Sequence, residues 1–107
     1  MSNYSDMPSE DREISALSLP PHSTEAEQSV LGGLMLENSA WDRIADVVSG
    51  EDFYRHEHRL IFRAIANLIN ESRPADVITV QESLERNEEL EAAGGVNYLI
   101  TLAQNTP

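Results

Sequence analysis

Cysteine and lysine are both absent from this chain of 107 residues. Without cysteine there is no disulfide framework and no thiolate chemistry, so the stability of the fold has to come from an apolar core. Without lysine the chain cannot carry the standard phosphate-binding loop, in which a lysine reaches the phosphates of a nucleotide. These two absences exclude disulfide-stapled scaffolds and the usual kind of nucleotide-binding domain.

Long hydrophobic runs are missing as well. No apolar stretch approaches the roughly 20 residues that a membrane-spanning helix needs. The N-terminal residues also lack the basic start and the apolar stretch that together mark a signal peptide. We therefore expect a soluble, cytosolic protein that has no membrane partner.

Positive charge is scarce. The seven basic residues are all arginine and stand against 19 acidic residues, which gives a formal net charge of −12. Binding to DNA or RNA relies on a cationic surface that releases counterions, and phosphates repel so acidic a chain at long range. The composition therefore favours a protein partner and argues against direct contact with nucleic acid.

The first part of the chain differs in composition from the rest. Residues 1–21 are rich in Ser, Asp, Glu and Pro and show no sustained hydrophobic period. Low hydrophobicity combined with acidic charge is typical of a disordered segment. We therefore predict a disordered acidic tail over residues 1–21 and one small domain over residues 22–107.

The remainder of the chain has the hydrophobic period of helices. Thr24 precedes the first helix and Glu27 lies three residues later, a spacing that predicts a capping box between the two side chains. That box would explain why an acidic residue lies beside the apolar line of the helix. Helices are predicted over residues 25–36, 39–48, 56–70, 77–86, 88–93 and 96–104.

One segment has some strand character. Ile78-Thr79-Val80 has β propensity, but a strand without a partner is not stable in water. Asp76 is a good N-cap for a helix that begins at the next residue. We therefore predict an all-α fold, a small orthogonal bundle of five or six short helices with no significant sheet.

No group of residues points to catalysis or to a metal ion. His56 and His58 flank Glu57, but residues two apart on a helix point to different faces and share an ion poorly. Both are interpreted as ordinary surface or capping histidines. A run of glutamates near residue 90 lacks a nucleophile and is interpreted as a solvated face. We assign no catalytic, cofactor-binding or metal-binding residue to the chain.

Arginine recurs every four residues at Arg55, Arg59 and Arg63. At about 100° per residue, this row lies nearly opposite the apolar face of its helix. Two interpretations are open. The row is a solvent face that offsets an acidic domain, which we favour, or a basic stripe that docks an acidic partner or phosphate. The second would make the chain a small helical DNA-binding or regulatory domain.

Three other residues are candidates for a partner interface. Val96 and Tyr98 follow a break at Gly94-Gly95, where an apolar and an aromatic side chain could anchor a partner. Burial of the same two side chains in the core of the domain is the alternative, and we favour it. Asp76, at the start of the helix predicted over 77–86, is the third candidate.

Several blocks of the sequence resemble the N-terminal domain of bacterial replicative DNA helicases of the DnaB family. The blocks occur in the family's order and at compatible spacing, and each is weak alone. They are Pro20-Pro21-His22, Glu25 to Gly32, Asp52-Phe53-Tyr54, His58-Arg59 with Ile61-Phe62, Asp76 to Thr79, Ser83-Leu84, and Gly94-Gly95 with Tyr98-Leu99. Family members continue into a helical hairpin, a linker and a RecA-like ATPase motor. The resemblance, which covers Leu19 to Pro107, therefore implies an isolated N-terminal domain without the motor.

The resemblance implies assembly and docking rather than catalysis. Full-length members of the family are hexameric helicases that use ATP and magnesium to unwind DNA at the replication fork. Their N-terminal domains pair into dimers within a collar on the ring, and the collar docks the C-terminal domain of primase. We therefore expect no cofactor in this chain and a location in the bacterial cytoplasm. The expected partners are other copies of the chain and primase, with a helicase loader as a further candidate.

Overall fold

The computed structural model describes residues 23–105, so the tail predicted over residues 1–21 lies outside the described residues. The main helices are α2 (Thr24–Leu36), α3 (Trp41–Ile44), α4 (His56–Asn70), α5 (Val77–Arg86) and α6 (Gly95–Gln104). Two short 3₁₀ turns, η1 (Asn38–Ala40) and η2 (Gly50–Asp52), lie on either side of α3. The described residues contain no strand, which confirms the predicted all-α fold.

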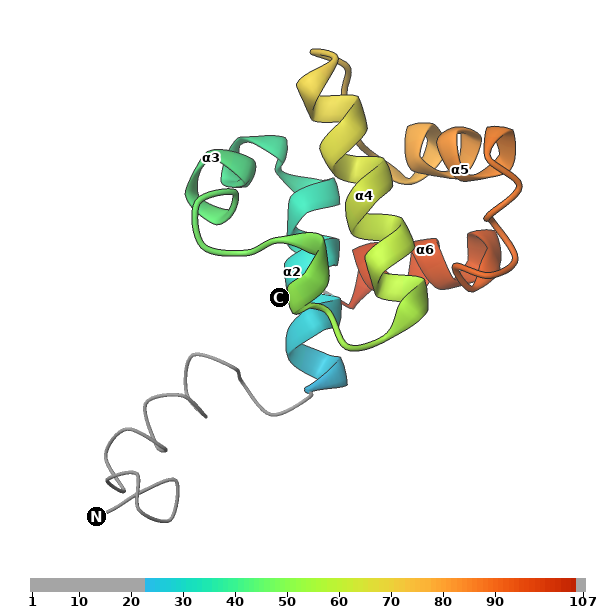
Figure 1. The fold of residues 1–107 in the computed structure, drawn as a ribbon. Helices are drawn as coiled ribbons and strands as arrows, with labels where there is room; N and C mark the ends of the chain where they lie inside the picture. Colours follow the sequence, from blue (N-terminus) through green and yellow to red (C-terminus); the bar gives the residue numbers. More distant parts are fainter. Residues whose placement is uncertain (1–22, 106–107) are drawn as a thin grey trace.

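Helix α4 lies in the middle of the bundle (Figure 1). It packs against α2 and α5, while α6 packs against both α2 and α5. In the view of Figure 1, α3 lies to one side of α2 and α4, and α5 and α6 lie to the other. None of the described helices has the length and apolar character needed to cross a membrane.

The core is built mainly from α4, whose apolar residues recur at helical spacing. Ile61, Ile65 and Leu68 are almost completely buried. Full burial of a side chain of this size stabilises a fold by about 1.5–3 kcal/mol. Helices α2, α5 and α6 each supply a smaller apolar stripe to the same core. Their most buried residues are Leu31, Leu34, Val80, Leu84, Leu99 and Leu102.

An aromatic group closes the core on the α3 side. The ring of Phe62 on α4 lies 5.3 Å from the ring of Trp41 and 4.9 Å from that of Phe53, measured between centroids. Both pairs are tilted, an arrangement that aromatic rings favour over a face-to-face sandwich. This group holds the short α3 and η2 segments against α4.

The capping box predicted for Thr24 and Glu27 is wrong. Ser23 is the N-cap of α2, and its hydroxyl accepts a hydrogen bond from the backbone N–H of Ala26 at 3.1 Å. Helix α2 therefore begins one residue earlier than predicted, and Glu27 falls at the fourth helical position, beyond the reach of a capping box. The predicted cap at Asp76 is confirmed, because its carboxylate accepts from the backbone N–H of Thr79 at 2.9 Å.

Two predicted helices differ from the structure. The helix predicted over 39–48 is shorter in the structure. The 3₁₀ turn η1 leads directly into α3, which ends at Ile44, and the chain continues as a turn. The β-branched pair Val47-Val48 is a weak helix former and favours this early end. The helix predicted over 88–93 is a series of turns instead. Glu88 has a φ of 57°, and this left-handed residue stops the helical path after α5.

Substitutions at Gly94 and Gly95 test how the chain enters α6. Both have positive φ, but a Cβ at Gly94 would lie 2.8 Å from Tyr98 Cδ2, whereas a Cβ at Gly95 would meet no atom within 4 Å. We expect Gly94→Ala to lower the unfolding free energy by about 2–4 kcal/mol, the sum of backbone strain and overpacking. Gly95→Ala should cost about 1 kcal/mol, since only the backbone is strained. Urea unfolding followed by circular dichroism measures both, and equal losses would contradict the described contact with Tyr98.

Candidate protein-interaction surface

The carboxylate of Glu27 is partly buried and faces α4 rather than capping a helix. One oxygen accepts a hydrogen bond from the backbone N–H of Tyr54 at 2.7 Å, and the other lies 2.6 Å from Nδ1 of His58. The side chain is only 11% exposed. Glu27 therefore joins α2 both to α4 and to the loop that precedes it, which explains an acidic residue on this side of α2.

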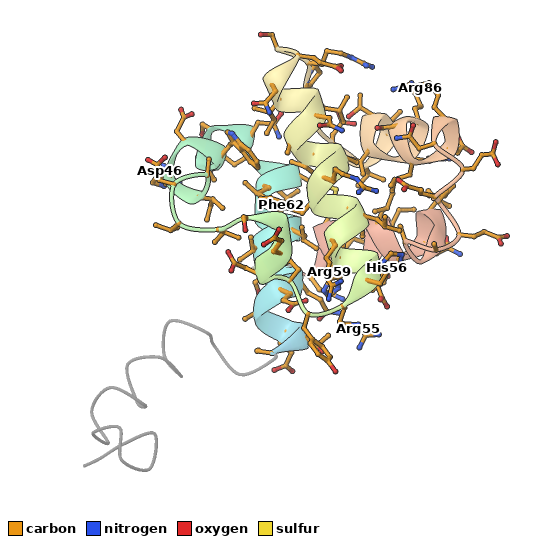
Figure 2. The ribbon with its side chains drawn as sticks, in the orientation of Figure 1. Asp46, Arg55, His56, Arg59, Phe62 and Arg86 are labelled. Carbon is orange, nitrogen blue, oxygen red and sulfur yellow. The ribbon has the colours of Figure 1, made fainter. Side chains whose placement is uncertain are left out.

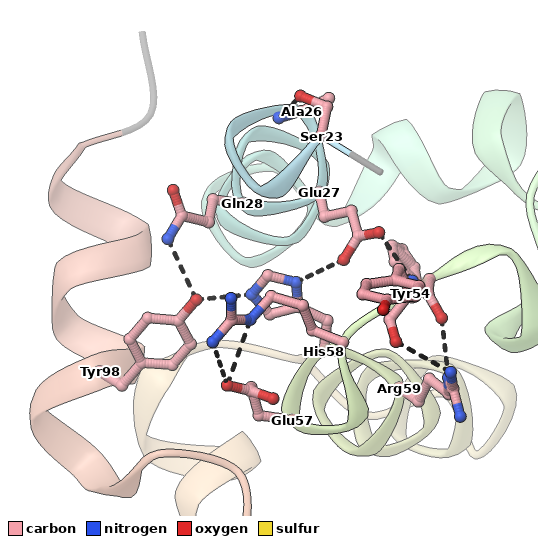
Figure 3. A network of polar contacts seen from close by, with 11 residues as sticks. Ser23, Ala26, Glu27, Gln28, Tyr54, Glu57, His58, Arg59 and Tyr98 are labelled. Atoms are coloured by element: carbon pink, nitrogen blue, oxygen red, sulfur yellow. Dashed lines mark hydrogen bonds and ion pairs between the residues drawn. The ribbon is translucent and has the colours of Figure 1, made fainter. Parts of the chain in front are cut away.

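His58 is completely buried, so its interpretation as a surface or capping histidine is wrong. Its Nε2 atom lies 2.5 Å from the hydroxyl of Tyr98, and the two rings stack 5.8 Å apart with an angle of 5° between their planes. The amide nitrogen of Gln28 donates to the same hydroxyl at 3.1 Å. Figure 3 shows this series running from α2 through α4 to α6 and back to α2.

The hydrogen bonds of this series agree on where each proton lies. An ionised Glu27 accepts only, so Nδ1 of His58 carries the proton between them. With Nδ1 carrying the only ring proton, Nε2 is an acceptor and the hydroxyl of Tyr98 donates to it. The oxygen of Tyr98 accepts in turn from Gln28. Both carboxylate oxygens of Glu27, both ring nitrogens of His58 and the hydroxyl of Tyr98 thus have partners, as buried polar groups require.

Two opposing effects act on the pKa of Glu27. Burial raises the pKa, but hydrogen bonds from the backbone of Tyr54 and from the side chain of His58 lower it, as does the backbone of Arg55. The balance places the pKa of Glu27 below its ordinary value of 4.5. Glu27 is therefore a carboxylate at neutral pH, in agreement with the proton positions above.

The order of carboxylate, histidine and hydroxyl is also the order of a nucleophilic triad. Here the hydroxyl belongs to a phenol that also accepts from Gln28, and the imidazole is wholly buried. The residues come from three helices that the contacts hold together. We therefore interpret Glu27, His58 and Tyr98 as a structural tie, named the polar tie below.

The three arginines proposed as a stripe are all exposed, but each has a partner inside the domain. Arg55 pairs with Glu57 at 2.9 Å, and Arg63 pairs with Glu89 at 2.7 Å. Figure 2 shows Arg55 and Arg59 near the start of α4. The hydrogen bond and the ion pair with Glu57 raise the pKa of Arg55 further above its already high ordinary value.

Arg59 is bound differently from the other two. Its Nε donates to the carbonyl of Phe53 at 2.7 Å, and Nη2 donates to the carbonyl of Tyr54 at 2.8 Å. No carboxylate among residues 23–105 lies within ion-pair distance of Arg59. These bonds fix the guanidinium in place but leave its positive charge uncompensated.

The other candidate interface residues lie at separate places. Asp76 is exposed but its carboxylate caps α5. Val96 and Tyr98 are half-buried on α6, and Tyr98 belongs to the polar tie. The structure places Arg59 and Arg63 on α4 beside one groove, whereas Arg55 precedes the helix as its N-cap residue and lines another, so the six candidates do not form one surface. Whether any of them contacts a partner stays a prediction.

Two grooves lie beside α4. The larger, about 610 Å³, is lined by Arg59, Phe62, Arg63 and Ala66 of α4 and by the segment around η2. The smaller, about 330 Å³, is more polar and includes Tyr98, Gln28 and Arg55 in its lining. Within the described residues, no group of three or more histidine, aspartate or glutamate side chains is placed to hold a metal ion.

The chain is similar to proteins of known name. Residues 19–107 match the model of the DnaB-like helicase N-terminal domain. The chain is 50% identical, over 95 residues, to a replicative DNA helicase DnaB from Buchnera aphidicola subsp. Schizaphis graminum, covering 89% of this chain and 20% of that protein. It is 44% identical to the replicative DNA helicase DnaB of Haemophilus influenzae over 107 residues, covering all of this chain and 23% of that protein.

The fold is similar as well. The crystal structure of the N-terminal domain of DnaB helicase from Mycobacterium tuberculosis matches with a TM-score of 0.79 and 40% identity, covering 82% of this chain and 64% of that one. The chain spans about a fifth of the length of the curated relatives it matches. Similarity therefore concerns one domain of those proteins.

The charge of Glu27 makes the domain sensitive to acid. Since its folded pKa lies below 4.5, its contribution to stability is complete above the unfolded pKa and disappears as pH falls through the folded pKa. We expect Glu27→Gln to cost about 1.5–3 kcal/mol at neutral pH, the usual range for hydrogen bonds to a charged group. As pH falls through the folded pKa of Glu27, below 4.5, the two proteins should converge in stability. Urea unfolding at several pH values measures this, and a loss independent of pH would contradict the assigned charge.

His56 and His58 provide a matched pair of variants that tests the polar tie. His58→Ala removes a buried ring and leaves Glu27 and Tyr98 without their shared partner, so we expect a loss of about 3 kcal/mol. His56 is exposed, and His56→Ala should change the unfolding free energy by less than about 0.5 kcal/mol. Thermal melts of both variants measure the difference, and similar losses would rule out the polar tie as a stabilising element.

Proposed function

The chain belongs to the family of DnaB-like helicase N-terminal domains, and on this premise we propose that it is a non-catalytic assembly and docking domain of a replicative helicase. The observation that carries the proposal is the match of residues 19–107 to that family, together with relatives of which the chain spans about a fifth. ATP hydrolysis, magnesium binding and DNA unwinding then belong to the remaining length of such a protein.

The surface of the domain suits contact with other proteins. Several large apolar side chains are exposed on different elements, among them Leu36, Val47 and Ile78 at 60%, 72% and 66% exposure. The polar tie and the apolar core hold α2, which carries Leu36, and the apolar core holds α5, which carries Ile78. A rigid body with exposed apolar side chains presents contact area at little cost in conformational entropy.

The partners that we propose are other copies of the domain in a ring collar and the C-terminal domain of primase. A helicase loader is a further candidate. The site of action would be the bacterial cytoplasm, at the replication fork. Direct DNA binding through Arg55, Arg59 and Arg63 is less well supported, because all three side chains already bond within the domain and the chain is strongly acidic.

Sedimentation of the full chain across a concentration series, with and without the C-terminal domain of a primase from a DnaB-containing bacterium, tests this function. We expect a defined complex at about 100 μM or below. The absence of a complex at that concentration would contradict the docking role. A fluorescently labelled DNA strand, added in about 50 mM salt, should show no binding, and binding that weakens steeply with salt would favour the DNA-binding alternative.

A further inference from the structure

The loop between η2 and α4 presents an exposed aromatic side chain on a backbone that is held in place. Tyr54 is 57% exposed. Its backbone N–H donates to Glu27 at 2.7 Å, and its carbonyl accepts from Nη2 of Arg59 at 2.8 Å. Figure 3 shows these two bonds meeting at Tyr54. A partner that covers the side chain of Tyr54 therefore does not have to order the backbone that carries it.

The residue before Tyr54 anchors the same loop from the core. Phe53 is only 3% exposed, and its ring lies 4.9 Å from that of Phe62, measured between centroids. The backbone of Phe53 is extended, and in extended backbone successive side chains point to opposite sides. Burial of Phe53 therefore turns the side chain of Tyr54 outward.

Arg59 places a fixed positive charge beside this loop. Its two hydrogen bonds use Nε and Nη2, so neither uses the N–H groups of Nη1. No ion pair among residues 23–105 includes Arg59. Hydrogen bonds between a guanidinium and a carboxylate are among the stronger ones in proteins. Arg59 therefore offers both a positioned donor and an uncompensated charge to an incoming carboxylate.

The larger groove beside α4 continues from Arg59. Ser49, Gly50 and Ala66 also line it, and their side chains are small or absent, so the backbone of a partner can approach closely. Phe62 is only 5% exposed, so the groove itself offers little aromatic contact. Its volume of about 610 Å³ is large enough for a few side chains of a bound segment.

Tyrosine and arginine side chains in preorganised positions are the residue types that dominate binding energy at protein interfaces. We propose that Tyr54 and Arg59 form the centre of a docking site for a segment of a partner protein that carries an apolar side chain next to a carboxylate. The apolar side chain covers the ring of Tyr54, the carboxylate binds Nη1 of Arg59, and the neighbouring residues of the segment enter the groove. This inference rests on the proposed docking function and names its surface and the chemistry of the partner.

The charges around this site favour a protein segment over nucleic acid. An aromatic ring and an arginine also suit single-stranded nucleic acid, in which bases stack and phosphates bind the cation. Glu51 and Asp52 are exposed on η2, however, and Glu51 lines the same groove as Arg59. A single carboxylate can meet Arg59 alone, whereas a strand brings a phosphate with every nucleotide towards these acidic residues. The net charge of −12 opposes a strand at longer range as well.

Random short peptides displayed on phage and selected against the full chain supply an unbiased probe. We expect the selected peptides to carry Asp or Glu next to a large apolar residue. One of them, made synthetically and added to ¹⁵N-labelled full chain, should shift the backbone amides of residues 53–60 most strongly. A selection that yields no binder, peptides without an acidic residue, or shifts centred elsewhere would overturn the proposal.

Two exposed residues form a matched pair for the same peptide. Tyr54 and Leu36 are 57% and 60% exposed, and Tyr54→Ala retains the backbone groups that bind Glu27 and Arg59. Tyr54→Ala should weaken peptide binding at least about tenfold, whereas Leu36→Ala should change it by less than about twofold. Because Arg59 also holds the loop, its charge is tested on the peptide, where replacing the acid by its amide should weaken binding about tenfold. Equal effects of the two protein variants, or no effect of the amide, would contradict docking at this site.

Two further spectra separate the other occupants. A concentration series of the chain alone and a titration with an oligothymidylate strand should both leave the amides of residues 53–60 unchanged. Shifts with protein concentration would show that a second copy covers Tyr54, and shifts with the strand would show a nucleic-acid site; either would overturn the proposal. Failure of the peptide tests while primase still forms a complex would remove this site and leave the docking function standing.

Discussion

The contact between Glu27 and His58 is the constraint on which the arrangement of the helices depends. It joins α2 to α4 across 31 residues of sequence, and the bond from His58 to Tyr98 extends it to α6 across another 40. The three polar groups have partners throughout, so their burial does not carry the cost of an unsatisfied polar atom. Such a network favours one packing arrangement over others, because alternative packings of the same apolar helices would leave it unpaired.

The same contact sets the geometry of the outer surface. Glu27 also holds the backbone of Tyr54, and Arg59 binds the carbonyls of Phe53 and Tyr54 from the other side. One backbone N–H and two backbone carbonyls of the loop between η2 and α4 are therefore held by side chains. The groove beside α4 lies next to this loop, so its walls are preorganised for a partner. Glu27 therefore takes part both in the polar tie and in holding the loop that borders the groove.

Local patterns in the sequence were sufficient for the long helices. The apolar period of the segment that became α4 is continuous, and its predicted bounds of 56–70 are those of the structure, as are the bounds of 77–86 for α5. The interrupted helix near Val47 and the turns after Glu88 were missed, because short segments depend on tertiary contacts and on single left-handed residues. No local pattern identified the contacts of the polar tie, since its members lie far apart in sequence. An acidic residue on an apolar helix face was a sign that a partner existed, but it did not identify His58.

The protonation of the His58 ring is the measurement that bears most directly on this account. Long-range ¹⁵N–¹H correlation spectra of the full chain at neutral pH report the state of both ring nitrogens. The polar tie predicts a neutral ring with the proton fixed on Nδ1, facing a charged Glu27, and Nε2 acting as the acceptor for Tyr98. A ring that averages between both tautomers, as a solvent-exposed histidine does, would contradict it.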